Sequence, residues 1–385
     1  MAEKKKQHYV PKVYLRCFAD VNKRFSVYNI EKRTAIPSAF CDNQCYRDYF
    51  YGKDCEWENQ LGEMETKWGV LFRLIHEHKQ LGEDDIKLLK TFALYQRQRT
   101  FAENEYRKKE NEELLIECGK MVCENKGIPF TEEARDICIK KADEHISPAQ
   151  LLQLSSDIIL TIDDLSVLII DYETKNKLIS SDVPVIAINQ FDKCAIGYAM
   201  MGLILLFPIS SSQLVVIYDR KMYPQFRNRL YIVSKNEKEV LRLNALQLIS
   251  GEKILFSYSM DEFQSFTEED WEWRGKNRDG NKLSSLGSSD RKLMCISTRK
   301  TLNNYEFSFA RMTSTFQKIP TSCREAVPRK WEQGWEEKLK VKITLLPEIM
   351  FEKKGYSHVG GLNKSQYKKG FERMLNAAKQ YWKIP

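Results

Sequence analysis

The sequence contains no hydrophobic run long enough to cross a membrane. A spanning helix needs about 18 or more apolar residues, and the longest apolar run, over residues 198–209, is shorter and contains Gly202 and Pro208. The first six residues are rich in lysine and lack the apolar stretch of a secretory signal. We therefore expect a protein without a membrane segment, located in the cytoplasm.

Common catalytic motifs are also absent. The chain has no P-loop, G-x-G-x-x-G, H-E-x-x-H or G-x-S-x-G pattern, and its five histidines leave few ways to build a His-rich zinc site. Ten cysteines are present, and the expected location favours reduced thiols over disulfides. Four of them lie early in the chain, at spacings that differ from those of common zinc fingers: Cys17, Cys41, Cys45 and Cys55. We expect these four to be small buried hydrophobic residues.

Positive charge is distributed unevenly. The net charge is +8, and residues 324–385 alone carry 14 Lys and Arg against 7 Asp and Glu. Tryptophans and tyrosines are interleaved with these cations, a pattern that can stack bases and hold phosphates. The region indicates a nucleic-acid or acidic partner, and a solvated lysine-rich surface is the alternative.

The N-terminal stretch over residues 7–18 is aromatic and aliphatic, whereas chain ends are usually polar. Pro11 suits the start of a helix, so His8 would lie just before that helix. In this place the imidazole can serve as an acid or base, or can only pack and cap. Alternating residues then predict a β-hairpin formed by strands at 24–30 and 34–40.

Two long helices are expected next, over residues 55–80 and 84–118. Apolar residues recur there every three or four positions, which indicates one buried face on each helix. Glu58 and Glu65 lie seven residues apart on the first helix, so both project at the border of its buried face. Two aligned carboxylates can hold a metal, share a proton or form salt bridges.

On the second helix, Gln96 falls within the apolar stripe and Arg99 follows it by three residues. A buried amide and guanidinium need partners. If the two helices pack antiparallel, Glu58 and Glu65 are the natural candidates. The result would be either a buried structural ion pair or an active-site cluster that includes His8.

A β-rich part follows. Its expected elements are a hairpin, two more strands, a helix and a closing strand, at residues 165–172 with 178–189, 203–208, 213–219, 236–249 and 253–258. Asp182 precedes Pro184, so the chain is irregular there, and its carboxylate can face a cleft or accept backbone hydrogen bonds. Asn244 lies among apolar residues of the helix and needs a partner, for which we consider Asp182.

Several of these features resemble a known family. They are the H-Y-V-P-x-x-Y-L-x-x-F start at residues 8–18, Q-x-x-R-T at 96–100, S-D-x-P at 181–184, and Asn244. Together they resemble an uncharacterised, mainly bacterial family, domain-of-unknown-function family 4238, over about residues 7–258. The resemblance implies no mechanism. Some members look like single-gene antiviral defence proteins, so it implies a role in defence against phage.

The expected fold class is α+β, with the N-terminal hairpin and a helical bundle packed on an antiparallel sheet. Residues 1–260 would form this domain, 261–291 a linker that ends rich in Gly and Ser, and 292–385 a smaller basic, aromatic-rich region. In that last region we expect strands at 293–298 and 341–346, followed by an amphipathic helix.

We expect the protein to be an intracellular bacterial effector in antiviral defence that acts on nucleic acid. If it is an enzyme, the expected activity is that of a metal-dependent nuclease. The residues assigned to catalysis are His8 as general acid or base and Glu58, Glu65 and Asp182 as ligands of Mg²⁺ or Mn²⁺ or to orient water. Those assigned to substrate binding are Gln96, Arg99 and Asn244. One alternative is a non-enzymatic sensor or adaptor that recognises a phage or host partner. Another is nucleotide or other small-molecule transfer chemistry at the same residues.

Overall fold

A five-stranded sheet forms the centre of the protein. The structure is a computed structural model that describes residues 5–145, 147–191, 197–278, 284–286, 293–295, 306–325, 327–332 and 334–383. The strand order is β10-β5-β9-β8-β7, with bounds β5 Ser166–Tyr172, β7 Ile186–Asn189, β8 Leu203–Pro208, β9 Gln213–Tyr218 and β10 Tyr231–Ser234. All neighbours are antiparallel except β10, which is parallel to β5.

Both faces of this sheet are covered. On β9, Leu214, Val216 and Tyr218 belong to one hydrophobic cluster, and Val215 and Ile217 belong to another. Successive side chains of a strand point to opposite faces, so the sheet is the middle layer between two cores. Mixed helices and mostly antiparallel strands make this an α+β fold, as predicted.

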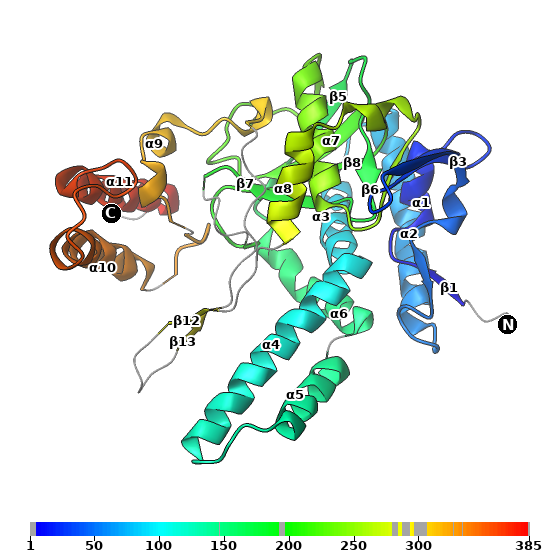
Figure 1. Cartoon of the computed structure of the whole chain (residues 1–385). Coiled ribbons are helices and arrows are strands. Elements are labelled where there is room, and N and C mark those ends of the chain that lie inside the picture. The colour runs from blue at the N-terminus through cyan, green and yellow to red at the C-terminus, as the bar shows by residue number, and fades with distance from the viewer. Residues whose placement is uncertain are drawn as a thin grey trace.

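One face carries the N-terminal elements (Figure 1). Its helices are α1 Lys12–Leu15, α2 Glu56–His76 and α3 Glu83–Gln98. A second, four-stranded sheet of order β3-β2-β11-β6 lies beside them, with β2 Arg24–Asn29, β3 Thr34–Phe40, β6 Ser180–Ser181 and β11 Ile254–Ser257. The predicted N-terminal hairpin is confirmed as β2 and β3. Strand β1, Lys6–His8, pairs with β4, Tyr46–Asp48, and ties the chain start into the fold.

The opposite face carries α7, Glu237–Ser250, together with the C-terminal helices. These are α9 Ser314–Gln317, α10 Trp335–Pro347 and α11 Lys364–Trp382. Phe371 and Met374 of α11 share the cluster that contains Leu214 and Val216 of the sheet. Arg329 is buried and forms an ion pair with Asp164 at 3.0 Å. The C-terminal region therefore packs on the same sheet as α7.

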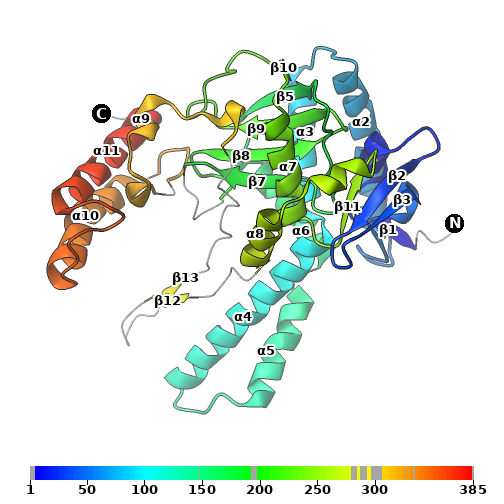
Figure 2. The same ribbon diagram turned by 45° about the horizontal axis from the view of Figure 1, so that its top comes forward.

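Two helices extend away from the body (Figure 2). They are α4, Phe101–Asn125, and α5, Glu132–His145, and α6, Pro148–Ile158, leads back to the sheet. Helix α8, Glu268–Arg278, follows the closing strand β11, so the first part of the predicted linker is helical. A short pair, β12 Ser284–Leu286 and β13 Leu293–Cys295, comes after it.

Short 3-10 helices and one π-helix connect the longer elements: η1 Arg16–Phe18, η2 Cys41–Asn43, η3 Ile159–Thr161, η4 Asp261–Ser265, η5 Ser308–Ala310, η6 Thr321–Cys323 and η7 Glu348–Lys353. Among the helices described, none combines the length and hydropathy that crossing a bilayer requires.

Three expected elements are wrong. The single helix over 84–118 is broken into α3 and α4, because Thr100 leaves the helical conformation and its hydroxyl accepts a hydrogen bond from the Glu103 N–H, which starts a new helix. The strand expected at 341–346 lies within α10, where Leu339 and Ile343 are buried four residues apart.

The third correction concerns the hairpin expected from 165–172 and 178–189. Strand β5 pairs with β9 and β10, whereas β7 pairs with β8. The intervening β6 pairs with β11 of the four-stranded sheet. The chain therefore crosses between the two sheets at residues 173–185, and local periodicity carries no information about that crossing.

Candidate functional site

Arg99 is the centre of a buried polar cluster on the N-terminal side. It ends α3 and is 1% exposed. Its Nε donates to the Tyr51 hydroxyl at 2.9 Å, and its Nη2 donates to the His8 carbonyl at 2.5 Å and to Glu65 Oε1 at 3.0 Å. The predicted contact between Arg99 and Glu65 is present, and Arg99 also fastens the first strand of the chain to α3.

The His8 side chain is buried beside this cluster. Its Nε2 lies 3.1 Å from the Asp42 carbonyl oxygen, to which only an N–H can donate. Burial, helped by the positive charge of Lys12, lowers the pKa of His8 to about 4. The imidazole is therefore neutral at pH 7 and holds β1 against the loop that precedes β4.

Asp182 lies in a different buried group. Its Oδ1 accepts the Glu252 N–H at 2.8 Å and its Oδ2 accepts the Lys253 N–H at 2.9 Å. Burial raises the pKa of Asp182 to about 6. Nearby, the Tyr9 hydroxyl and the Cys45 thiol hydrogen-bond to each other, and the charge of Asp182 raises the pKa of both groups further, after burial. Of the two roles considered for Asp182, these contacts correspond to the one in which its carboxylate accepts backbone hydrogen bonds.

Gln96 and Asn244 both bind backbone. Gln96 Nε2 donates to the Tyr9 carbonyl at 3.0 Å. Asn244 Oδ1 accepts the Ile179 N–H at 3.0 Å and its Nδ2 donates to the Lys177 carbonyl at 2.8 Å, so it binds the chain before β6 rather than Asp182.

Glu58 lies near the Arg99 cluster. Burial raises the pKa of Tyr51 to about 12 against the opposing effect of Arg99, and the charges of Glu65 and Glu58 add to the rise. In the described parts of the chain, no group of three or more His, Cys, Asp or Glu side chains could hold a metal ion. The catalytic and metal-binding roles assigned from the sequence remain predictions.

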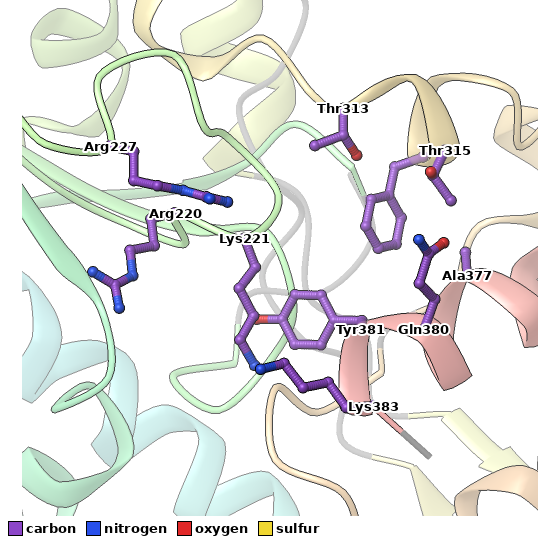
Figure 3. Close-up of a pocket in the computed structure, with 10 residues that line it drawn as sticks. Arg220, Lys221, Arg227, Thr313, Thr315, Ala377, Gln380, Tyr381 and Lys383 are labelled. Carbon is purple, nitrogen blue, oxygen red and sulfur yellow. The ribbon is translucent and has the colours of Figure 1, made fainter. Parts of the chain in front are cut away.

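A pocket of about 500 Å³ lies elsewhere, between the end of β9 and the C-terminal helices. Four of its lining residues are basic, none is acidic, and the rest are hydroxyl, amide, aromatic and alanine side chains: Arg220, Lys221, Arg227, Lys383, Thr313, Thr315, Gln380, Phe316, Tyr381 and Ala377. Figure 3 shows the loop after β9 with Arg220, Lys221 and Arg227 on one side and α11 with Tyr381 on the other. None of the seven residues assigned from the sequence lines it.

Sequence reasoning missed this pocket. One local signal was present, because Arg220, Lys221, Arg227 and Arg229 lie within ten positions directly after a buried strand. The opposite wall comes from residues more than 80 positions away in the chain. Lys383 belongs to the basic C-terminal region that the charge distribution did indicate.

The fold and these sites define an α+β protein with a buried polar cluster at its N-terminal side and a basic pocket at its C-terminal side. Within the described residues, Arg99 Nη1 and Gln96 Oε1 of that cluster have no hydrogen-bond partner. Residues 6–261 match the family described as "Protein of unknown function (DUF4238)". This match covers more than half of the chain, so the protein belongs to that family. Searches of curated proteins and of solved structures gave no significant match.

Proposed function

We propose that this protein is an effector that binds nucleic acid through the basic pocket. The observation that supports this function is the lining of the pocket, to which four basic residues and no carboxylate contribute. Lys and Arg side chains that contact phosphates supply most of the sequence-independent affinity for nucleic acid. The charge of the C-terminal region, an excess of seven cations over residues 324–385, acts in the same direction.

The four pocket cations are available for a ligand. In the described part of the chain, Arg220, Lys221, Arg227 and Lys383 form no ion pair with an acidic side chain. Lys221 Nζ lies 4.6 Å from the centroid of the Tyr381 ring, a contact that leaves its charge unneutralised. Phosphate groups are the biological anions that Arg forks and Lys ammonium groups bind best.

Binding is tested by fluorescence anisotropy with single-stranded and duplex DNA and RNA at 50 and 200 mM salt. The double variant Arg220→Gln/Arg227→Gln should lose about tenfold in affinity and reduce the salt slope by about two. A matched double variant, Lys32→Gln/Lys126→Gln, removes two exposed cations outside the pocket and should stay within about twofold. Absence of binding at low salt, or equal losses in both variants, would refute the proposal.

The resemblance supports a role in antiviral defence but carries no mechanism, so the nuclease reaction, with His8 as acid or base, is a separate part of the proposal. Incubation of the same nucleic acids with Mg²⁺ or Mn²⁺, for the wild type and for Glu65→Gln, tests that step. Cleavage that disappears in the variant while its melting temperature is unchanged would support a catalytic role. Cleavage by neither protein would leave binding as the activity to pursue.

The adaptor alternative has an observation of its own in its favour. His8, Arg99 and Asp182 are each at most 4% exposed, and each is hydrogen-bonded to backbone. Groups held in this way stabilise the fold without contacting a substrate. If His8→Gln lowers phage protection and melting temperature together, the N-terminal cluster acts through stability and the adaptor function is favoured.

A further inference from the structure

The walls of the basic pocket come from two parts of the chain. Arg220, Lys221 and Arg227 follow β9 and lie within the residues that match the family, whereas α9 and α11 lie beyond residue 261, where the match ends. A ligand in this pocket would therefore contact the loop after β9 and the C-terminal elements at once.

Asp219 joins the two walls underneath. Its Oδ1 accepts the Lys221 N–H at 3.1 Å and the Met222 N–H at 3.3 Å, which fixes the turn that carries two of the cations. Its Oδ2 accepts the Gly202 N–H at 3.0 Å and the Tyr381 hydroxyl at 2.9 Å. Asp219 is 2% exposed, so its carboxylate faces inward and organises the basic turn from below.

A second observation lies beside the first. The Tyr218 hydroxyl is buried and has no hydrogen-bond partner within the described residues. Burial raises the pKa of Tyr218, and the positive charges of Arg220 and Arg227 oppose that rise, so this hydroxyl lies within electrostatic reach of both guanidinium groups. A buried donor left unpaired destabilises the fold. Tyr218 does not line the pocket itself, but it directly precedes the turn that carries the pocket cations, and both Arg220 and Arg227 act on its hydroxyl.

Size and lining narrow the class of ligand. About 500 Å³ is within the usual range for one small ligand, so the pocket can enclose one nucleotide unit, such as the end of a strand, but not a longer stretch of polynucleotide. Four cations match the charge of a terminal phosphate or a short polyphosphate chain. Thr313, Thr315 and Gln380 offer hydrogen bonds, and Phe316 offers an apolar ring, as sugar and base groups require.

We infer that the pocket takes a single nucleotide unit through its terminal phosphates, and that this ligand locks α11 onto the central sheet. The inference rests on the proposed function and deepens it, because the same cations would hold the phosphates of either a strand end or a free nucleotide. The ligand adds a second connection between the walls that Asp219 and Tyr381 already join.

The first experiment measures the melting temperature of the full chain with ATP, GTP, adenosine, and one oligonucleotide carrying either a 5′-phosphate or a 5′-hydroxyl. A terminal phosphate should raise the melting temperature by several degrees at saturation, whereas adenosine and the 5′-hydroxyl strand should not. The variant Arg220→Gln/Arg227→Gln should weaken nucleotide binding by at least tenfold, and Lys32→Gln/Lys126→Gln should leave it unchanged.

The second experiment measures hydrogen exchange with and without the nucleotide that binds. Exchange should slow both at residues 219–229 and in α11, and remain unchanged in the β2–β3 hairpin. Slower exchange in only one of these two segments would refute the inference that the ligand locks α11 onto the central sheet. The comparison of ligands identifies the source of the phosphate, because a response only to the 5′-phosphorylated strand indicates a strand end and a response only to ATP or GTP indicates a free nucleotide.

Failure of the inference can be told apart from failure of the proposed function. Salt-dependent binding of 5′-hydroxyl and 5′-phosphate strands with equal affinity, and no response to nucleotides, would refute the inference and keep nucleic-acid binding. A response to free nucleotides without polymer binding would support the inference and refute the proposed function.

Discussion

The N-terminal polar cluster and the C-terminal basic pocket use cations in opposite ways. Arg99 is enclosed and donates to Tyr51, His8 and Glu65, whereas Arg220 and Arg227 line an open pocket without an acidic partner in the described chain. In the N-terminal cluster, the guanidinium of Arg99 holds three segments of the fold together through these hydrogen bonds. The basic pocket leaves its charge without an acidic partner in the described chain, and no sequence motif marks it.

The largest loss of stability is expected from a substitution of Arg99. Replacing it by Met removes the donor to the partly buried Glu65 and to the buried Tyr51 hydroxyl, and leaves the His8 carbonyl with the Tyr51 hydroxyl as its remaining donor. The free energy of unfolding should therefore fall by roughly 3 kcal/mol or more. Urea unfolding measures this loss. Arg16→Met is the matched control, because its ion pair with Asp42 is 45% and 37% exposed and is worth less than about 1 kcal/mol. Similar losses in the two variants would contradict the structural role of Arg99.

Acid titration provides the next largest effect, because His8 and Asp182 oppose each other. His8 has a folded pKa of about 4 and an unfolded one of 6.5, so its contribution is lost as the pH falls from 6.5 to 4. Asp182 has a folded pKa of about 6 and an unfolded one of 3.8, so stability falls as the pH rises between these values. Each effect reaches roughly 3 kcal/mol, and the two largely offset each other between pH 4 and 6.

Single substitutions of His8 and Asp182 should separate their two contributions to the pH dependence of stability. Between pH 4 and 6, the stability of His8→Gln should fall with rising pH relative to the wild type, and that of Asp182→Asn should rise. Urea midpoints measured every half pH unit give both slopes. Parallel curves for the wild type and both variants would show that neither group titrates as its burial requires.

The contact between the two walls of the pocket should have a smaller effect. Tyr381→Phe removes the hydroxyl that donates to Asp219 and should cost about 1–2 kcal/mol, because that bond is buried and its acceptor is charged. Tyr231→Phe is the control, since its hydroxyl donates to the Lys79 carbonyl in an exposed place and should cost less than about 0.5 kcal/mol. Equal losses would mean that Asp219 does not anchor α11.

The pocket cations should have the smallest effect on folding. Arg227→Gln should change the free energy of unfolding by less than about 0.5 kcal/mol, because Arg227 is exposed and has no acidic partner in the described chain. Arg329→Gln sharpens the contrast, because Arg329 is buried and paired with Asp164, and its loss should cost several times more. Chemical unfolding of both variants makes the comparison. A large loss of stability in Arg227→Gln would mean that this cation stabilises the fold rather than being available for a ligand.

Much of the secondary structure could be predicted because it depends on local pattern. The β2–β3 hairpin, the strands β8 and β9, the helix α7 and the amphipathic α11 all follow from the spacing of their apolar residues. The contact of Arg99 with Glu65 was also within reach, because a buried guanidinium needs a carboxylate. The break at Thr100 and the crossing of β6 between the sheets were not, because they depend on a cap and on distant strand partners.

By itself, the sequence determined the α+β class, the tying of residues 7–18 into the core, and the excess of cations near the C-terminal end. Only the tertiary structure decided what the polar residues do. It closed His8, Arg99 and Asp182 into backbone contacts, and it brought Arg220 to the same pocket as Lys383. The physical reason is that side-chain type and spacing specify local structure, whereas burial and free charge depend on which distant segments pack together.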